Sequence, residues 1–308
     1  MRWPEWIAAS AILGPLLLVL VHRLTGRRLR PDWAAPALVV GSLTVAGCTA
    51  CLLAVLAWAA VARIPFVGGI GAWPSNRVGT VVRFPVGLSW FAAGIGVLLL
   101  VNLGRVVASE VSRIRDARAT LAGLRPTPAV AVVVDDLPYA YALNGWHRGG
   151  RRVIVSTGMI ETLPASELEC VLAHERVHLE RHHAVYQLLC DLAAALNPLL
   201  RWTGQDLDFA LERWADEAAA ESTDRGTVAD ALLRSALAAL DFRVEHPAVR
   251  ASWGARSVPE RLDALLVPPG RSRWMVVAYV VVCGIGMGVM LRALERSEDL
   301  VEALQKLR

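Results

Sequence analysis

Residues 166–178 read SELECVLAHERVH and end in the pattern His-Glu-x-x-His. At about 3.6 residues per turn, His174 and His178 lie one above the other on one helix face, so both imidazoles can bind one Zn²⁺. Glu175 then projects beside them, where a carboxylate can take a proton from an activated water. The Ser-x-x-Glu pattern at the start predicts a capping box. The segment therefore predicts a capped helix that carries two metal ligands and a general base.

A catalytic zinc site needs a third protein ligand and an open position. The segment 205–222 predicts another helix, in which Glu212 and Asp216 share a face because they are four residues apart. We expect Glu212 to bind the metal and Asp216 to accept a hydrogen bond from the far nitrogen of a ligand histidine. His182 and His183 are the competing ligands, but they follow the motif too closely to close a tetrahedron easily. The alternative without metal is a solvated helix face that carries histidines and carboxylates.

The composition divides between a membrane and water. The chain has 308 residues, of which 55% are hydrophobic and 19% charged, and its mean hydropathy is +0.44. Soluble domains have about 45–50% apolar and about 25% charged residues, so a wholly soluble or disordered chain is excluded. The 32 basic and 28 acidic residues exclude a uniformly embedded chain. We therefore expect membrane spans together with a charged domain in water.

Four apolar runs are candidate spans. They predict three transmembrane helices within residues 1–108, a metallopeptidase domain at 109–272, a fourth span at 273–292 and a short tail at 293–308. Arginines cluster between the first two runs, after the third and before the fourth, which places all three segments on the cytoplasmic side. We thus expect a plasma-membrane protein with a cytoplasmic peptidase domain and with both termini outside. Cys48 and Cys51 lie inside an apolar run, so we expect neither a zinc knuckle nor a disulfide there.

The domain begins with short strand patterns at 129–134, 139–143 and 152–156, followed by helical patterns. This order predicts an α+β fold, in which a small sheet packs beside the His-Glu-x-x-His helix of a zincin-like domain.

The sequence resembles the gluzincin membrane metallopeptidases, most closely the BlaR/MecR-type family of antibiotic-sensor transducers. The resemblance covers most of residues 129–266, and the matching stretches are 154–158, 174–179, 196–200, 212–218 and 259–262. The close alternative is the HtpX-type membrane peptidase family, which has the same ligand types but places two spans between the motif and the third ligand. Here only 34 positions separate His178 from Glu212. Two crossings need about 40 apolar residues, so the spacing favours the BlaR/MecR-type interpretation.

The resemblance implies a zinc endopeptidase with one Zn²⁺ per chain. It implies that the substrate binds as an extended strand along an edge strand formed by Tyr139, Ala140, Tyr141 and Ala142. Candidates for the oxyanion donor are His246, Arg250 and Arg261, with a structural ion pair as the alternative role for Arg261. Only residues 292–308 follow the last run, so we expect no extracellular sensor domain.

The family further suggests a cytoplasmic protein substrate such as a BlaI-like repressor, no direct nucleic-acid binding and a possible oligomer. Two other functions stay open: an HtpX-type quality-control peptidase and a non-catalytic zinc-binding membrane signal transducer. The intact Glu175 argues against the second, because a purely structural zinc site does not need a general base.

Overall fold

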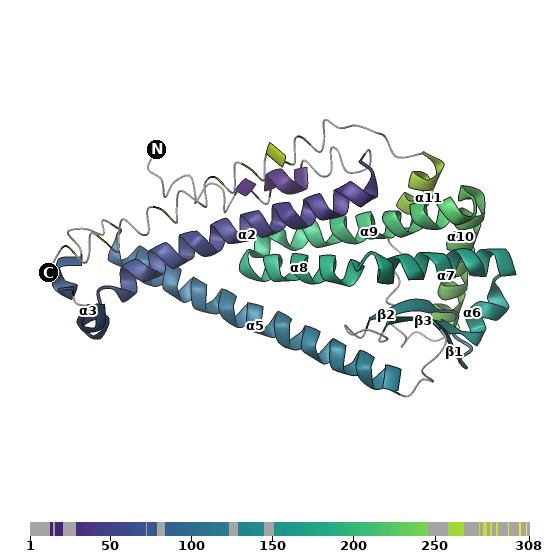
Figure 1. Cartoon of the computed structure of the whole chain (residues 1–308), viewed down its shortest axis with the longest axis horizontal. Coiled ribbons are helices and arrows are strands. Elements are labelled where there is room, and N and C mark those ends of the chain that lie inside the picture. Colours follow the sequence, from purple (N-terminus) through teal and green to yellow (C-terminus); the bar gives the residue numbers. More distant parts are fainter. Residues whose placement is uncertain are drawn as a thin grey trace.

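A computed structural model gives the fold of most of the chain (Figure 1). It describes residues 13–14, 16–20, 29–71, 73–78, 84–122, 129–144, 151–245 and 258–267, with single positions between 277 and 306. The described part is mostly helical and contains one small sheet. The first and fourth predicted spans lie mostly outside it.

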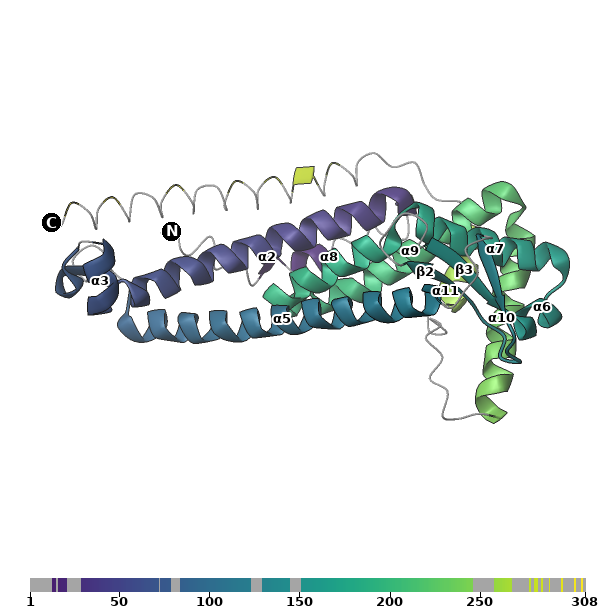
Figure 2. The same cartoon turned by 60° about the horizontal axis from the view of Figure 1, so that its bottom comes forward.

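Two long helices run along the length of the molecule (Figures 1 and 2). These are α2, Pro31–Val61, and α5, Val86–Ala122, and in the described residues they alone are long and apolar enough to cross a membrane. Only 11% of the apolar window of α5 is buried, against 44% for α2. The short helices α3, Pro65–Gly71, and η1, Ser75–Arg77, follow α2 in the chain.

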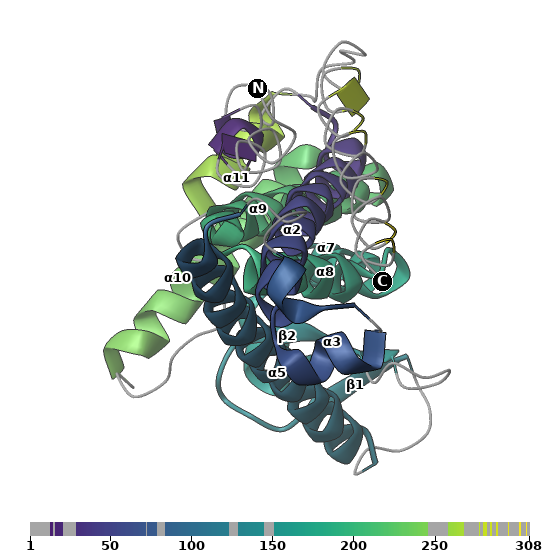
Figure 3. The ribbon, with the colours of Figure 1, turned by 90° about the vertical axis from the view of Figure 1, so that its left-hand side faces the viewer.

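A shorter helical hairpin packs between these two helices. It consists of α8, His183–Leu196, η2, Pro198–Leu200, and α9, Arg201–Ser222, and its helices lie against α2 (Figure 3). Apolar side chains of α2, α8 and α9 form one shared core cluster. The hydrogen bonds that join the hairpin to the long helices include Asn197 Nδ2 to Thr49 Oγ1 at 2.9 Å, Ser42 Oγ to Thr203 Oγ1 at 3.3 Å and Asn102 Nδ2 to the carbonyl oxygen of Ala195 at 3.3 Å.

The sheet has three strands in the order β1-β3-β2. They are β1, Val130–Val133, β2, Ala140–Asn144, and β3, Arg151–Ser156; β1 is parallel to β3 and β2 is antiparallel to it. The central strand is the most buried, and β2 is an edge strand within the described residues. Gly158 is required where α6, Thr157–Thr162, begins, because a Cβ there would lie 2.2 Å from the Asp136 carbonyl oxygen.

Helix α7, Ala165–Glu180, holds the His-Glu-x-x-His motif and packs against β2, β3, α9 and α10. It begins at Ala165, two residues before the start that Ser166 as N-cap would require. Pro164 is the N-cap, no side chain caps the helix, and Ser166 lies within its first turn, so the capping prediction was wrong. Proline stiffens this entry by fixing its own φ. Helices α10, Arg225–Glu245, and α11, Val258–Leu266, complete the domain around α7.

Candidate metal centre

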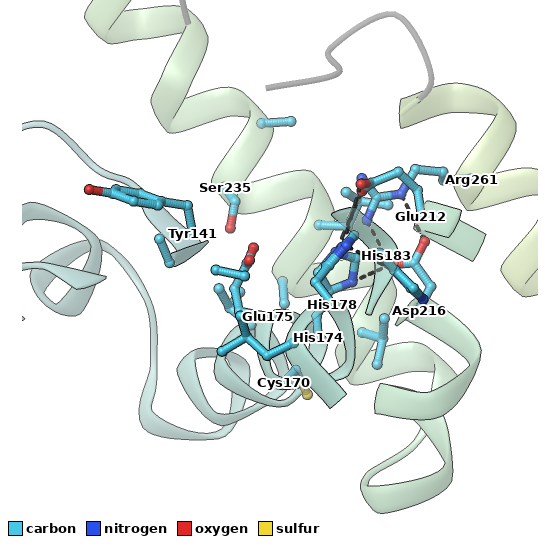
Figure 4. Close-up of a pocket in the computed structure, with 18 of the residues that line it drawn as sticks. Tyr141, Cys170, His174, Glu175, His178, His183, Glu212, Asp216, Ser235 and Arg261 are labelled. Atoms are coloured by element: carbon cyan, nitrogen blue, oxygen red, sulfur yellow. Dashed lines mark hydrogen bonds and ion pairs between the residues drawn. The ribbon is translucent and has the colours of Figure 1, made fainter. Parts of the chain in front are cut away.

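Three side chains converge at one point between α7 and α9 (Figure 4). His174 and His178 come from α7 and Glu212 comes from α9, which packs beside it. The two Nε2 atoms are 3.1 Å apart, and each lies 3.5 Å from an oxygen of Glu212. In a tetrahedral zinc site, bonds of about 2.0–2.1 Å separate the ligand atoms by about 3.3 Å. The three donors therefore fit zinc in both chemistry and spacing.

Asp216 and Arg261 surround these ligands. Asp216 Oδ1 lies 3.0 Å from His174 Nδ1, on the side of the ring away from the ligand cluster. Arg261, from α11, places Nη1 2.7 Å from Glu212 Oε2 and donates two hydrogen bonds to the Asp216 carboxylate, at 2.6 and 2.8 Å. The buried guanidinium of Arg261 thus orients two carboxylates. One is Glu212, a metal ligand, and the other is Asp216, which contacts the ligand His174.

These contacts set the charges of the metal-free site. Burial disfavours the ionised forms, but His174 and Arg261 hold the pKa values of Glu212 and Asp216 below their usual range. Burial also opposes the charged form of His174, yet hydrogen bonds and charges from Asp216 and Glu212 raise its pKa to about 10. For His178, burial and the charge on His174 lower the pKa to about 4. His174 therefore carries a proton near neutral pH and must release it to bind a metal.

Glu175 sits beside the ligands without joining them. Its carboxylate points toward a cavity near Ser235 of α10 (Figure 4), and the backbone N–H of Ala142 in β2 donates to it. Burial, together with the negative charge of Glu212, raises the pKa of Glu175 to about 7 despite the opposing charge of His174. A carboxylate with this pKa can both take and return a proton near neutral pH.

The cavity next to Glu175 has a volume of about 310 Å³. One wall is β2, with Ala140, Tyr141 and Ala142. The opposite wall comes from α7 and α10 and is mostly apolar, with Val171, Val228, Ala231, Leu232 and Ser235. A free strand edge, a carboxylate and an apolar hollow therefore meet at one place.

The other residues predicted for the site are not among the three metal ligands. His246 and Arg250 are outside the described residues, and the guanidinium of Arg261 is committed to two carboxylates. Tyr139 precedes β2, and its hydroxyl donates to Asp135 Oδ2 at 3.1 Å. His182 is exposed, and His183 is buried behind His178, so neither belongs to the ligand cluster. The contact between His183 and His178 could not be predicted, because it depends on the turn between α7 and α8.

Comparison with known proteins finds a family match for the segment that holds the site. Residues 106–218 match peptidase family M48. The M48 segment contains the two histidines, Glu175, Glu212 and Asp216, whereas Arg261 lies beyond it. The Protease HtpX homolog of Pyrococcus abyssi is 33% identical over 184 residues, which are 56% of this chain and 60% of the relative.

Other relatives have the same name over shorter stretches. The Protease HtpX homolog of Moorella thermoacetica is 36% identical over 89 residues, 29% of each chain. Protease HtpX of Pseudoalteromonas atlantica is 33% identical over 86 residues, 28% of this chain and 29% of the relative. The chain thus spans about 60% or less of the length of these curated relatives. No solved structure matches it.

These matches support a metalloendopeptidase and correct the family resemblance. The curated relatives are HtpX proteins, not BlaR/MecR-type transducers, so the BlaR-like and signal-transduction interpretation has no support. The spacing argument failed because it assumed that every HtpX-type chain crosses the membrane twice between the second histidine of the motif and the third ligand. Here that segment forms the short hairpin of α8 and α9 along α2.

Proposed function

We propose that this protein is an HtpX-type membrane zinc endopeptidase that cleaves extended segments of cytoplasmic proteins with broad specificity. The observation that carries the proposal is the convergence of His174, His178 and Glu212 within 4.8 Å, with Glu175 next to them in the motif. The M48 match and the HtpX relatives support the same activity.

The chain's own residues suit peptide hydrolysis. When bound, zinc supplies a Lewis acid that polarises a peptide carbonyl and activates water. Glu175 takes a proton from the attacking water and later delivers it to the leaving amine. A C–O bond forms as the peptide C–N bond breaks. Asp216 and Arg261 keep His174 and Glu212 oriented while this happens.

The walls of the cavity indicate the form of the substrate. β2 pairs only with β3 in the described part, so its other edge can bind a substrate main chain by strand addition. The apolar hollow beside α10 can take one apolar side chain next to the scissile bond. A folded protein does not offer such a segment, whereas an unfolded one does, which favours a quality-control role over cleavage of one repressor.

The membrane part of the proposal rests on α2, α5 and the arginine distribution. Both helices can span the bilayer, and the apolar surface of α5 is suited to lipid. Arginines cluster in the C-terminal half of α5, beyond its apolar window, and this bias supports a cytoplasmic peptidase domain.

The test compares the full chain in detergent with its Glu175→Gln variant, both loaded with zinc. We expect the wild type to cut unfolded casein and to leave a stably folded protein intact, while the variant binds zinc equally and cuts neither. Equal cleavage of casein by both would refute the role of Glu175. A proteomic comparison of cells that carry either form then separates the two biological roles. Many proteins shortened only in wild-type cells would support quality control, whereas a single such protein would support cleavage of a regulatory target.

A further inference from the structure

A second histidine contact lies directly behind the metal ligands. His183 Nδ1 is 2.9 Å from His178 Nδ1, and the two rings meet edge-on with their centroids 4.6 Å apart. The other nitrogen of His178, Nε2, faces Glu212. Each ring nitrogen of His178 therefore has a defined neighbour, the ligand cluster on one side and His183 on the other.

The position of one proton follows from this arrangement. A histidine that binds a metal through Nε2 carries its proton on Nδ1. Two nitrogens at 2.9 Å share one proton, so His178 Nδ1–H donates and His183 Nδ1 accepts. His183 is then the neutral tautomer protonated at Nε2, an atom that is buried and has no hydrogen-bond partner among the described residues.

The fold holds His183 firmly in this place. His183 is 1% exposed, and its ring packs against those of Trp214 and Tyr186, at centroid distances of 5.2 and 6.5 Å. A turn in the left-handed region precedes it, since His182 has a φ of 56° and is the one non-glycine residue with positive φ in the described chain. That conformation costs about 1–2 kcal/mol.

The strained turn has its own supports. The Leu179 carbonyl oxygen lies 3.0 Å from His182 Nδ1 and accepts a hydrogen bond from Arg151 Nη1 at 3.2 Å. Helix α7 ends at Glu180, two residues after His178, and α8 begins at His183, so the turn returns the His183 ring to the α7 face that carries His178. Strain retained beside a functional group is typical of residues whose placement matters.

We propose that His183 is a positioning residue that fixes the tautomer and ring orientation of His178. This inference rests on the zinc site of the proposed function. The two ligand histidines are then held differently, His174 by the anionic Asp216 and His178 by a neutral acceptor. A neutral acceptor leaves one negative charge fewer near the metal than a second carboxylate would.

The test uses a matched pair of substitutions in the full chain. His183→Asn keeps an acceptor near the position of Nδ1, whereas His183→Leu has nearly the same size and no acceptor. Zinc dissociation constants are measured by competition with a chelator. Loss of a hydrogen-bond partner of a metal ligand typically costs about 10–100-fold in metal affinity, so we expect the Leu variant to bind zinc at least about tenfold more weakly than the Asn variant. Equal affinities would overturn the proposal.

A second measurement does not depend on the variants folding. In the zinc-loaded wild type labelled with ¹⁵N-histidine, ring-nitrogen chemical shifts should report a proton on Nδ1 of His178 and on Nε2 of His183. A proton on Nδ1 of His183 would refute the proposed acceptor. Both readouts are independent of cleavage, so a wild type that meets them and cuts no casein refutes the proposed function alone.

Discussion

Arg261 Nη1 lies 2.7 Å from Glu212 Oε2, and the same guanidinium pairs with Asp216 Oδ1 at 2.6 Å. Arg261 is 8% exposed and belongs to α11, the last described helix, whereas both carboxylates belong to α9. The closing helix of the domain therefore supplies the positive charge that balances the metal centre before any metal binds.

Substitution of Arg261 should destabilise the metal-free protein strongly. Arg261→Gln leaves two carboxylates with reduced compensation, and breaking a buried pair typically costs about 3–5 kcal/mol in the free energy of unfolding. The matched control is Arg113→Gln, which removes an exposed ion pair with Glu110 and should cost less than about 1 kcal/mol. Denaturant unfolding in detergent measures both, and equal losses would contradict the buried ion-pair interpretation.

The metal-free protein should lose stability as the pH rises from 6.5 to 8. The raised pKa of His174 contributes stability below its unfolded value of 6.5 that disappears as pH rises toward about 10. The raised pKa of Glu175 acts in the same direction between 4.5 and about 7. The lowered pKa values of His178 and His183 oppose this trend below pH 6.5, where their stabilisation is lost as pH falls. The lowered pKa values of Glu212 and Asp216 oppose it only at acid pH, where their stabilisation is lost as pH falls through the folded values.

Thermal unfolding of the chelator-treated protein across this pH range tests the sign. In Glu175→Gln the contribution of Glu175 between pH 4.5 and 7 should disappear, whereas the decline above pH 7 that comes from His174 should remain. Zinc should raise the melting temperature more at pH 8 than at pH 6, because protons compete with the metal for His174. A metal-free protein whose stability rises steadily from pH 6.5 to 8 would show that these assignments are wrong.

Removal of the third ligand should abolish tight zinc binding. In Glu212→Ala only His174 and His178 remain in the cluster, so we expect less than stoichiometric zinc after dialysis. Glu217→Ala in the same helix is the control, because Glu217 pairs with Arg225 and is not part of the cluster. Metal analysis of both purified variants decides the assignment, and stoichiometric zinc in Glu212→Ala would point to another ligand.

Filling the apolar hollow should change which peptides are cut. Ser235 lies on α10 and points toward Glu175 across the cavity (Figure 4), so Ser235→Phe should obstruct a large side chain next to the scissile bond. We expect kcat/KM to fall at least about tenfold for peptides with Leu or Phe there and little for those with Ala, consistent with about 1–3 kcal/mol per lost methylene-sized contact. Ser235→Ala is the control and should leave this preference unchanged. An equal loss for all peptides would place the pocket elsewhere.

Much of the site could be predicted because its parts are local. His174, Glu175 and His178 need only helical periodicity to share one region of α7, and Glu212 and Asp216 need only the same periodicity in α9. The strand patterns at 129–134, 139–143 and 152–156 agree closely with β1, β2 and β3, since alternating and β-branched segments beside turn residues report local conformation.

The rest depends on tertiary packing. Arg261 reaches the carboxylates only because α11 folds back onto α9, and His183 reaches His178 only because His182 adopts a left-handed turn. The packing of the α8–α9 hairpin against α2 likewise depends on a core shared by segments far apart in the chain. The amino-acid pattern by itself determined which groups could bind a metal and act as a base. The tertiary structure decided which partners hold them, because contacts between distant elements follow from packing and not from the spacing of residues along one helix.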